Sequence, residues 1–544
     1  MLRLSFMLYF ISFSRFIPPP VLHPSMKNIL LLLSVCCLTK FSFAAPNFIV
    51  VYMDDLGWAD TSVEMVRDQS ETRSDFYETP NLEQLAEEGM VFSDAYAPAP
   101  VCTPSRNSIL HGMTPARMLN TTLNTTFSKE NYRGLITIPQ AIKRANPEYV
   151  TAHYGKWHIG SISPEKAGYD VTENMKGTGN GEGDFMDDMK TFLPEEDPKR
   201  IFSLTEMSKK FMTEQVEADR PFYLQLSHYS VHIWHDSLKE TRAKYRALPR
   251  PEKATDEDYL PEDEISESAF KHNWLLNYAA MVDDTDRAFG DLLAHLDTLG
   301  IRENTYVIFT SDNGGGLRGN KPLRGAKADL TEGGIRVPFI VRGPGIPKNS
   351  YCATPTAGWD LLPTLYDLAG GIKRLPKELD GVSLASAFVK GDAAKLRRSG
   401  DGALVFHFPW YNGEPESCIR RGEYKLLKNL DTRESALYNV VDDLSESNDL
   451  SEIYPEIAAS LEDQLSDYLS EVGAEKVNQL REIFLKNLAN WIPQGESKAE
   501  TLRKQAATGD AAAAKQLQRL EKHIEWMKEQ IIFTKERMAL HPAI

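Results

Sequence analysis

The chain has 544 residues, of which 42% are hydrophobic and 25% charged, so it is long enough to bury a large core and has the composition of a globular protein. Its formal net charge of −16 argues against nucleic acid as a partner. The same charge would repel a polyanionic substrate, so a site for one would have to be locally positive.

Residues 1–45 are predicted to be a signal peptide. A lysine precedes a short apolar run over residues 29–38, and small residues at Ser42 and Ala44 form a cleavage site. The run is too short to span a bilayer, so we expect an exported protein with no membrane span. Met26 is interpreted as the true start. A lipoprotein cysteine at Cys36 is disfavoured because a bulky residue precedes it.

Two apolar runs end abruptly in polar residues. Residues 48–53 are followed by Asp54 and Asp55, and residues 306–310 are followed, after a serine, by Asp312 and Asn313. Buried parallel strands have this pattern, and ligands bind beyond the carboxyl ends of such strands. An all-oxygen set of ligands suits a hard cation such as Ca²⁺ or Mg²⁺.

Cys102 lies where a helix is predicted to begin. Alternating Ala and Pro residues precede it, Pro104 suits a first helical turn, and Gly112 can end the helix. Arg106 lies one turn further on and faces the same way as Cys102. The simplest interpretation of a lone cysteine here is a small buried thiol, but a helix start also favours negative charge.

Further candidates follow two later strands. Lys156 and His158 are two residues apart, on one face if the segment is extended. Three histidines, His228, His232 and His235, follow the strand predicted over residues 222–226.

Residues 46–400 alternate strand-like and helix-like segments, which predicts a mostly parallel α/β sheet. Besides those above, strands are expected over residues 150–154 and 339–341, and helices over 82–89, 278–299 and 361–368. The acidic cluster at residues 281–286 is interpreted as a solvated face of its helix.

The motifs together resemble the formylglycine-dependent sulfatases of the alkaline-phosphatase-like superfamily, from about residue 47 to 450. Cys102–Arg106 matches the Cys-x-Pro-Ser-Arg signature, Gly155–Gly160 matches a second signature, and Leu323–Lys327 with Glu332–Pro338 resembles a third block. His111 departs from the family, which usually has Thr at that position.

The resemblance implies a fold, an α/β domain whose mostly parallel central sheet is flanked by helices, with a smaller C-terminal α+β subdomain and a helical tail. We place the catalytic domain at residues 46–400, the subdomain with a small antiparallel sheet at 401–480, and the helical extension at 481–544.

The resemblance also implies hydrolysis of sulfate esters, with Cys102 oxidised by a maturation enzyme to formylglycine. One hydroxyl of its hydrate attacks sulfur and the other later expels sulfate.

The resemblance implies one divalent cation, with Ca²⁺ preferred over Mg²⁺. It would be held by Asp54, Asp55, Asp312, Asn313 and the modified Cys102. Arg106 would orient the diol, Lys156 and Lys327 would bind sulfate, and His158 would act as base. We assign the leaving-group acid to His232, with His228 and His235 as competitors. The expected substrate is a sulfated sugar.

Two other functions are weighed against this one. A phosphodiester or phosphonate monoester hydrolase can use the same cysteine motif and a similar metal site. A non-catalytic glycan-binding protein with an unconverted Cys102 is a different class, which the intact set of acid, base and metal-ligating residues argues against.

The later part of the chain has weaker signals. Long loops over residues 174–200 and 236–266 are expected to wall the cleft. Strands are predicted over residues 404–408, 423–427 and 436–440, with a helix from Tyr454. His407, Trp410 and Tyr411 are either a sugar-stacking edge or an ordinary aromatic cluster. Cys352 and Cys418 are either a disulfide or two buried thiols.

The tail carries a heptad seam. Its apolar side chains alternate spacings of three and four: Leu517, Leu520, Ile524, Met527, Ile531, Thr534 and Met538. Such a stripe must be buried. It packs either on its own domain or the preceding helix across Gly509, or on a second subunit in a homo-oligomer.

Overall fold

The structure is a computed structural model that describes residues 45–123, 134–160, 162–173, 196–233, 235–259, 274–316, 320–410 and 414–541. These residues form one compact unit. Among them, no helix has the length and apolar character needed to cross a membrane.

The main sheet has eight strands in the order β5-β4-β6-β1-β7-β8-β2-β9. Its strands are β1 (Asn47–Met53), β2 (Met90–Phe92), β4 (Val150–Gly155), β5 (Val171–Thr172), β6 (Phe222–Ser227), β7 (Thr305–Ser311), β8 (Phe339–Arg342) and β9 (Ser350–Cys352). Strands β5, β4, β6, β1 and β7 are parallel, and only β8 runs against its neighbours. Five consecutive parallel strands confirm the predicted mostly parallel sheet and gather their carboxyl ends at one edge.

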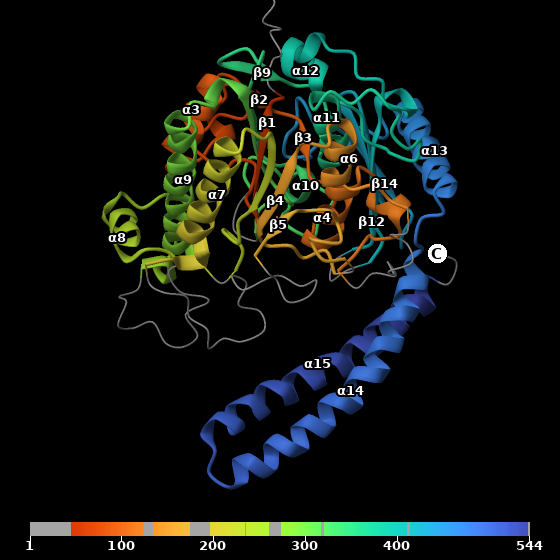
Figure 1. Ribbon diagram of the computed structural model, residues 1–544. Coiled ribbons are helices and arrows are strands. Elements are labelled where there is room, and N and C mark those ends of the chain that lie inside the picture. The colour runs from red at the N-terminus through yellow and green to blue at the C-terminus, as the bar shows by residue number, and fades with distance from the viewer. Residues whose placement is uncertain are drawn as a thin grey trace, which may run out of the picture. The chain divides into compact units, whose positions relative to one another are not determined.

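Helices cover both faces of this sheet (Figure 1). Alternate residues of β1 point to opposite layers: Ile49 and Val51 pack against one set of helices, and Phe48 and Val50 against the other. The first layer holds α3 (Pro80–Glu88), α7 (Ile201–Glu217) and α9 (Trp274–Thr298). The second holds α6 (Ile138–Ala145), α11 (Leu361–Leu368) and α12 (Ala385–Lys390). The predicted strands and helices of this domain are therefore confirmed.

Shorter elements complete the domain: β3 (Ala95–Tyr96), β10 (Thr356–Ala357), α4 (Cys102–His111), α5 (Pro115–Met118), α8 (Lys239–Ala247) and α10 (Glu332–Ile335). Helix α8 lies inside the segment predicted as a loop over residues 236–266, so that prediction is wrong there. Residues 174–195 and 260–266 of the two predicted loops lie outside the described residues.

The acidic cluster on α9 is buried, so its interpretation as a solvated face is wrong. Asp284 accepts hydrogen bonds from the backbone of Leu238 and from Thr241 Oγ1 at the start of α8. Asp286 accepts from the backbone of Asn81 and Leu82 in the first turn of α3. The two carboxylates thus satisfy helix N-termini that come from distant parts of the chain.

The C-terminal subdomain contains an antiparallel sheet and a packing helix, as predicted. Its strands are β11 (Leu404–Phe408), β12 (Glu416–Arg421), β13 (Tyr424–Asn429) and β14 (Ser435–Asn439), and its helix is α13 (Pro455–Glu471). Strand β12 was not predicted. Buried ion pairs join the sheet to the first domain: Lys425 Nζ donates to Glu332 at 2.9 Å, and Arg420 pairs with Asp94.

Two open alternatives in this region are decided. Cys352 and Cys418 are both buried free thiols, so the disulfide is excluded. His407 is buried and its ring nitrogens contact Ser417 Oγ and the carbonyl of Glu475, so it does not form a sugar-stacking edge. Trp410 packs on Phe484 and Arg481, which is the ordinary aromatic cluster. Tyr411 lies outside the described residues.

The tail is a helical hairpin of α14 (Val477–Ala507) and α15 (Ala511–Leu540), seen side by side in Figure 1. Gly509 allows the turn because its φ is +95°. Ile524 and Met527 of the predicted seam pack against Leu488 and Ala499 of α14. The seam is therefore buried on the preceding helix, one of the alternatives expected.

Candidate active site

The carboxyl ends of the central strands place the acidic residues together. Asp54 and Asp55 follow β1, and Asp312 and Asn313 follow the adjacent β7. All four are buried. Asn313 Nδ2 donates to Asp55 Oδ1 at 2.7 Å, and the backbone of Asp55 donates to Asp312 Oδ1 at 3.2 Å. The oxygen-rich cluster predicted from the two runs is present.

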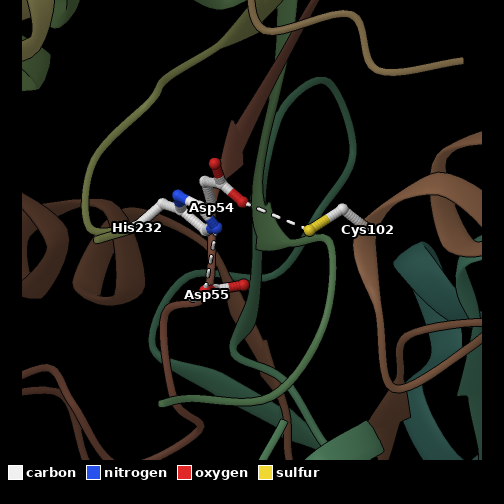
Figure 2. A group of neighbouring side chains, drawn as sticks. All are labelled: Asp54, Asp55, Cys102 and His232. Carbon is white, nitrogen blue, oxygen red and sulfur yellow. Dashed lines mark hydrogen bonds and ion pairs between the residues drawn. The ribbon is translucent and has the colours of Figure 1, made fainter. Parts of the chain in front are cut away.

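Cys102 is the first residue of α4 and points at this cluster. Its Sγ lies 3.7 Å from Asp54 Oδ1, and Figure 2 shows Cys102 and His232 approaching the two aspartates from opposite sides. Helix α4 ends at Gly112, whose φ of +67° gives the left-handed cap that the sequence predicted. One potential ligand atom from each of Asp54, Asp55, Cys102 and His232 lies within 4.8 Å of the others.

Two lysines complete the surroundings of Cys102. Lys156, which follows β4, places Nζ 2.6 Å from Asp54 Oδ2 and 3.8 Å from Cys102 Sγ. Lys327, from a loop distant in sequence, places Nζ 2.7 Å from both oxygens of Asp55 and 3.4 Å from Cys102 Sγ. Both ammonium groups therefore lie within 4 Å of the thiol, each from a different segment of the chain.

Arg106 lies one turn along α4 from Cys102. Its Nε donates to Asp312 Oδ2 at 2.7 Å, and its Nη1 donates to the carbonyl of Lys156 at 2.9 Å. The guanidinium thus connects the end of β7 to the end of β4 and holds the backbone of Lys156 in position.

The candidate histidines differ in position. His232 Nε2 lies 3.8 Å from Asp55 Oδ2, whereas no such approach is found for His228, a buried residue on the same loop. The ring of His235 instead packs edge-on against Trp274 and Tyr278. His158 adopts a left-handed backbone with φ of 50°, as does Asp55 with 66°, and such conformations in residues other than glycine gather at functional sites.

Burial and the cations set the protonation states. Burial raises the pKa of the Cys102 thiol to about 12, so the sulfur stays protonated and is a poor nucleophile. Burial also raises the pKa of Asp54, but the charges of Lys156, His232 and Arg106 outweigh it and hold that pKa well below the usual range. Burial together with the charge of Lys156 lowers the pKa of His158 to about 2, so its imidazole is neutral and can accept a proton.

The charges of the cluster are balanced. Three carboxylates, Asp54, Asp55 and Asp312, face three cations, Arg106, Lys156 and Lys327. A divalent cation at the carboxylates would make the cluster positive by two charges, which is the local field that an anionic substrate needs in a chain of net charge −16.

The sequence did not predict the role of one residue that positions the site. Asn320 is buried, and its Nδ2 donates to the carbonyls of Gly325 and Gly333, while the backbone of Lys327 donates to Gly315. These bonds hold the glycine-rich loop that carries Lys327. The only local signal was an asparagine within a glycine-rich segment, which usually indicates no more than a turn.

The comparison with protein families agrees with this geometry. The family model described as "Sulfatase" matches residues 46–372, which is more than half of the chain. The chain belongs to the sulfatase family. It is a sulfuric ester hydrolase with the alkaline-phosphatase-like fold expected from its motifs.

This sulfatase is similar to several known proteins. A sulfatase of Formosa agariphila is 28% identical over 530 residues, covering 82% of this chain and 89% of the relative. An ulvan-active sulfatase of the same organism is 26% identical, covering 79% and 82%. The crystal structure of Ps i-CgsB in complex with k-i-k-neocarrahexaose superposes with a TM-score of 0.63 at 24% identity, covering 78% of this chain and 93% of that one.

Proposed function

We propose that this sulfatase hydrolyses sulfate esters of a sulfated carbohydrate, with a nucleophile derived from Cys102 and with one divalent cation. The observation that carries the proposal is the position of Cys102, at a helix start and within 3.8 Å of Asp54, Lys156 and Lys327. A thiol held protonated in this position has no evident use as a nucleophile. Conversion to formylglycine would give a hydrate whose hydroxyl can attack sulfur.

The residues present fit a hard divalent cation. Asp54, Asp55 and Asp312 supply carboxylate oxygens, and Asn313 Oδ1 is buried without a hydrogen-bond partner. A modified Cys102 side chain would add a further oxygen ligand. Ca²⁺ takes six to eight oxygen ligands in flexible geometry, which favours it over Mg²⁺. When bound, the cation would polarise a sulfate oxygen and lower the pKa of the attacking hydroxyl.

The chain's own side chains would bind and orient the ester. Lys156 and Lys327 would each donate to a sulfate oxygen, because both ammonium groups already face Cys102 from different segments. Arg106 would hold Asp312 and the backbone of Lys156 in fixed positions relative to each other. Neutral His158 would accept the proton that is released when sulfate leaves.

The acid for the leaving alcohol is assigned to His232. Burial and the charge of Lys156 lower its pKa, whereas Asp54 and Asp55 raise it. Arrival of a negatively charged sulfate would add to the second effect and favour the imidazolium form. Its place opposite Cys102 suits a group that donates to the departing oxygen (Figure 2).

Maturation and export complete the proposal. Cys102 is buried in the folded chain, so a formylglycine-generating enzyme would have to act before folding is complete. An N-terminal signal peptide would carry the protein to the periplasm or the exterior, where sulfated polysaccharides occur. The sugar substrate is supported by the ulvan-active relative.

The experiment compares a sulfate ester and a phosphate ester of the same alcohol, using enzyme co-produced with a maturation enzyme. The proposal expects kcat/KM to be higher for the sulfate, and expects chelation to abolish turnover and Ca²⁺ to restore it. Faster turnover of the phosphate would favour a phosphodiester or phosphonate monoester hydrolase. Binding of glycan without turnover of either ester would favour a glycan-binding protein.

A further inference from the structure

The α14–α15 hairpin has two faces that differ in chemistry. Its buried seam includes Leu502 and Gly495 on α14 and Leu520 and Met527 on α15; a side chain at Gly495 would contact Ile524. The residues that immediately follow seam positions lie on one face, because two ion pairs cross the hairpin there. Arg503 pairs with Glu521 at 2.6 Å and Lys528 with Glu496 at 2.9 Å.

Residues that immediately precede seam positions must then lie on the opposite face of both helices, since the helices are antiparallel. On this face the spacings of three and four residues recur along each helix. Its larger aromatic and basic side chains are Trp491, Lys498, Arg519, His523, Trp526 and Phe533. Amide side chains, Asn487, Gln494 and Gln530, fill positions between them.

This face holds no carboxylate among the described residues of the two helices. All seven glutamates of α14 and α15 fall at other positions: Glu482, Glu496, Glu500, Glu521, Glu525, Glu529 and Glu536. We call it the acid-free face. Such a segregation of acids is unusual in helices as rich in glutamate as these, because an ordinary solvated surface mixes both signs.

The aromatic rings of the acid-free face are exposed, and two of them contact a neighbouring side chain. Trp491, Trp526 and Phe533 are 43%, 40% and 49% exposed. The ring of His523 stacks on Trp526 with 5.4 Å between centroids and 16° between planes, and the guanidinium of Arg537 lies 5.9 Å from the Phe533 ring. Exposed, oriented rings of this size mark a binding surface.

We propose that the acid-free face binds a sulfated polysaccharide chain. Aromatic rings would stack on the apolar faces of sugar rings, amides would bond hydroxyl groups, and Lys498 and Arg519 would pair with sulfates. The inference rests on the proposed function, because it takes a sulfated polymer as the substrate. It adds a second point of attachment, formed by residues other than those of the active site.

Charge favours this ligand. Residues 477–540 contain eleven Lys and Arg against eight Asp and Glu, a net charge of +3. Because the whole chain has a net charge of −16, the other residues together carry −19. The hairpin is therefore the segment that a polyanion would meet without net repulsion. A second copy fits less well, because a two-fold contact of this face with itself would oppose the same cations and no acids.

The test uses the full-length protein with Trp491→Ala and Trp526→Ala combined. Mobility in gels containing dextran sulfate measures binding, with unsulfated dextran as the reference polymer. The matched control carries Ile532→Ala and Lys504→Ala, which lie off the acid-free face. We expect the tryptophan variant to bind dextran sulfate about tenfold more weakly, given the energy of two aromatic contacts, and the control to bind as wild type.

A second variant, Lys498→Ala with Arg519→Ala, should weaken binding and reduce its salt dependence. Both variants should turn over a small aryl sulfate at the wild-type rate. If the wild-type enzyme itself had no activity, the proposed function would be refuted, whereas the dextran sulfate result would still test the binding face. Unchanged dextran sulfate binding in both variants would overturn the inference. A smaller particle mass by light scattering in the tryptophan variant, with unchanged binding, would overturn it as well, by showing that copies of the chain pair through this face.

Discussion

Arg106 Nε donates to Asp312 Oδ2 at 2.7 Å, and this pair joins helix α4, which begins with Cys102, to the end of strand β7. The same guanidinium donates to the carbonyl of Lys156, so a single side chain links three segments of the site. A buried charge with two such contacts is a positioning device as much as a source of charge.

Replacing Arg106 with Lys should keep the charge and lose the geometry. A lysine cannot make both contacts, so we expect kcat/KM to fall about 10²-fold, as misplacement of a catalytic group does. The measurement is turnover of an aryl sulfate by the variant. Arg398→Lys is the matched control: it disturbs another buried pair, Arg398 with Asp360, and should lower stability with little change in kcat/KM. Equal losses in the two variants would argue against a special role for Arg106.

Asp312→Ala should lower the metal content and the activity, because it removes a carboxylate from the predicted metal site. It should also lower stability, because it leaves the buried guanidinium of Arg106 without its 2.7 Å partner. Burial raises the pKa of Asp312 to about 6, so the carboxylate is mostly ionised at neutral pH and available to a cation, and metal binding should weaken as the pH falls below about 6. Metal content by plasma mass spectrometry is the measurement, with Asp170→Ala, a surface carboxylate paired with Lys143, as control. Wild-type metal content in Asp312→Ala would exclude Asp312 as a ligand.

His232→Ala should affect substrates with basic leaving groups far more than activated aryl sulfates. General acid catalysis contributes roughly 10²–10⁴-fold when the leaving alkoxide is basic, and little when it is not. The measurement is the ratio of kcat values for an alkyl and an aryl sulfate. His228→Ala, a buried histidine of the same loop, serves as control. A similar loss on both substrates in His232→Ala would move the acid role elsewhere.

Asp286 provides a test of the buried acidic cluster. Burial raises its pKa to about 6, above the value near 4 of an unfolded aspartate. Because the folded chain holds the proton more tightly, this group's contribution to the free energy of unfolding falls as the pH rises from about 4 to about 6. In Asp286→Asn this decrease should be absent. Urea unfolding of both proteins between pH 4 and 7 gives the difference, and a constant difference over that range would contradict the assignment.

Asp286→Ala should be more harmful than the asparagine variant. It leaves the backbone donors of Asn81 and Leu82 without partners inside the protein, at a cost of about 1–3 kcal/mol. Activity at saturating metal and substrate should change little, because Asp286 caps α3 rather than contacting the site.

The sequence was informative where chemistry is local. An apolar run that stops at Asp54 and Asp55, or at Asp312 and Asn313, identifies both a buried strand and the polar edge beyond it, because a parallel strand cannot keep carboxylates in its core. Cys102 could be placed at a helix start from its prolines alone.

Long-range partners were not predictable in the same way. Asp284 and Asp286 resemble a solvated stripe until the donors of Leu238 and Asn81, distant in sequence, are known. Strand β12 was missed because Glu416–Arg421 carries three charged residues in six, and its register comes from β11 and β13 on either side. The Lys327 contact with Asp55 depends on a loop held by Asn320, which no local pattern indicates.

The mass of the peptide that contains Cys102, taken from the active enzyme, tests the proposed chemistry at its first step. Enzyme produced with a maturation partner should carry an aldehyde in place of the thiol, and aryl sulfatase activity should rise in proportion to the converted fraction. Enzyme produced without that partner should retain the thiol and show little turnover. A fully active enzyme whose Cys102 is an unmodified thiol would contradict the proposed nucleophile.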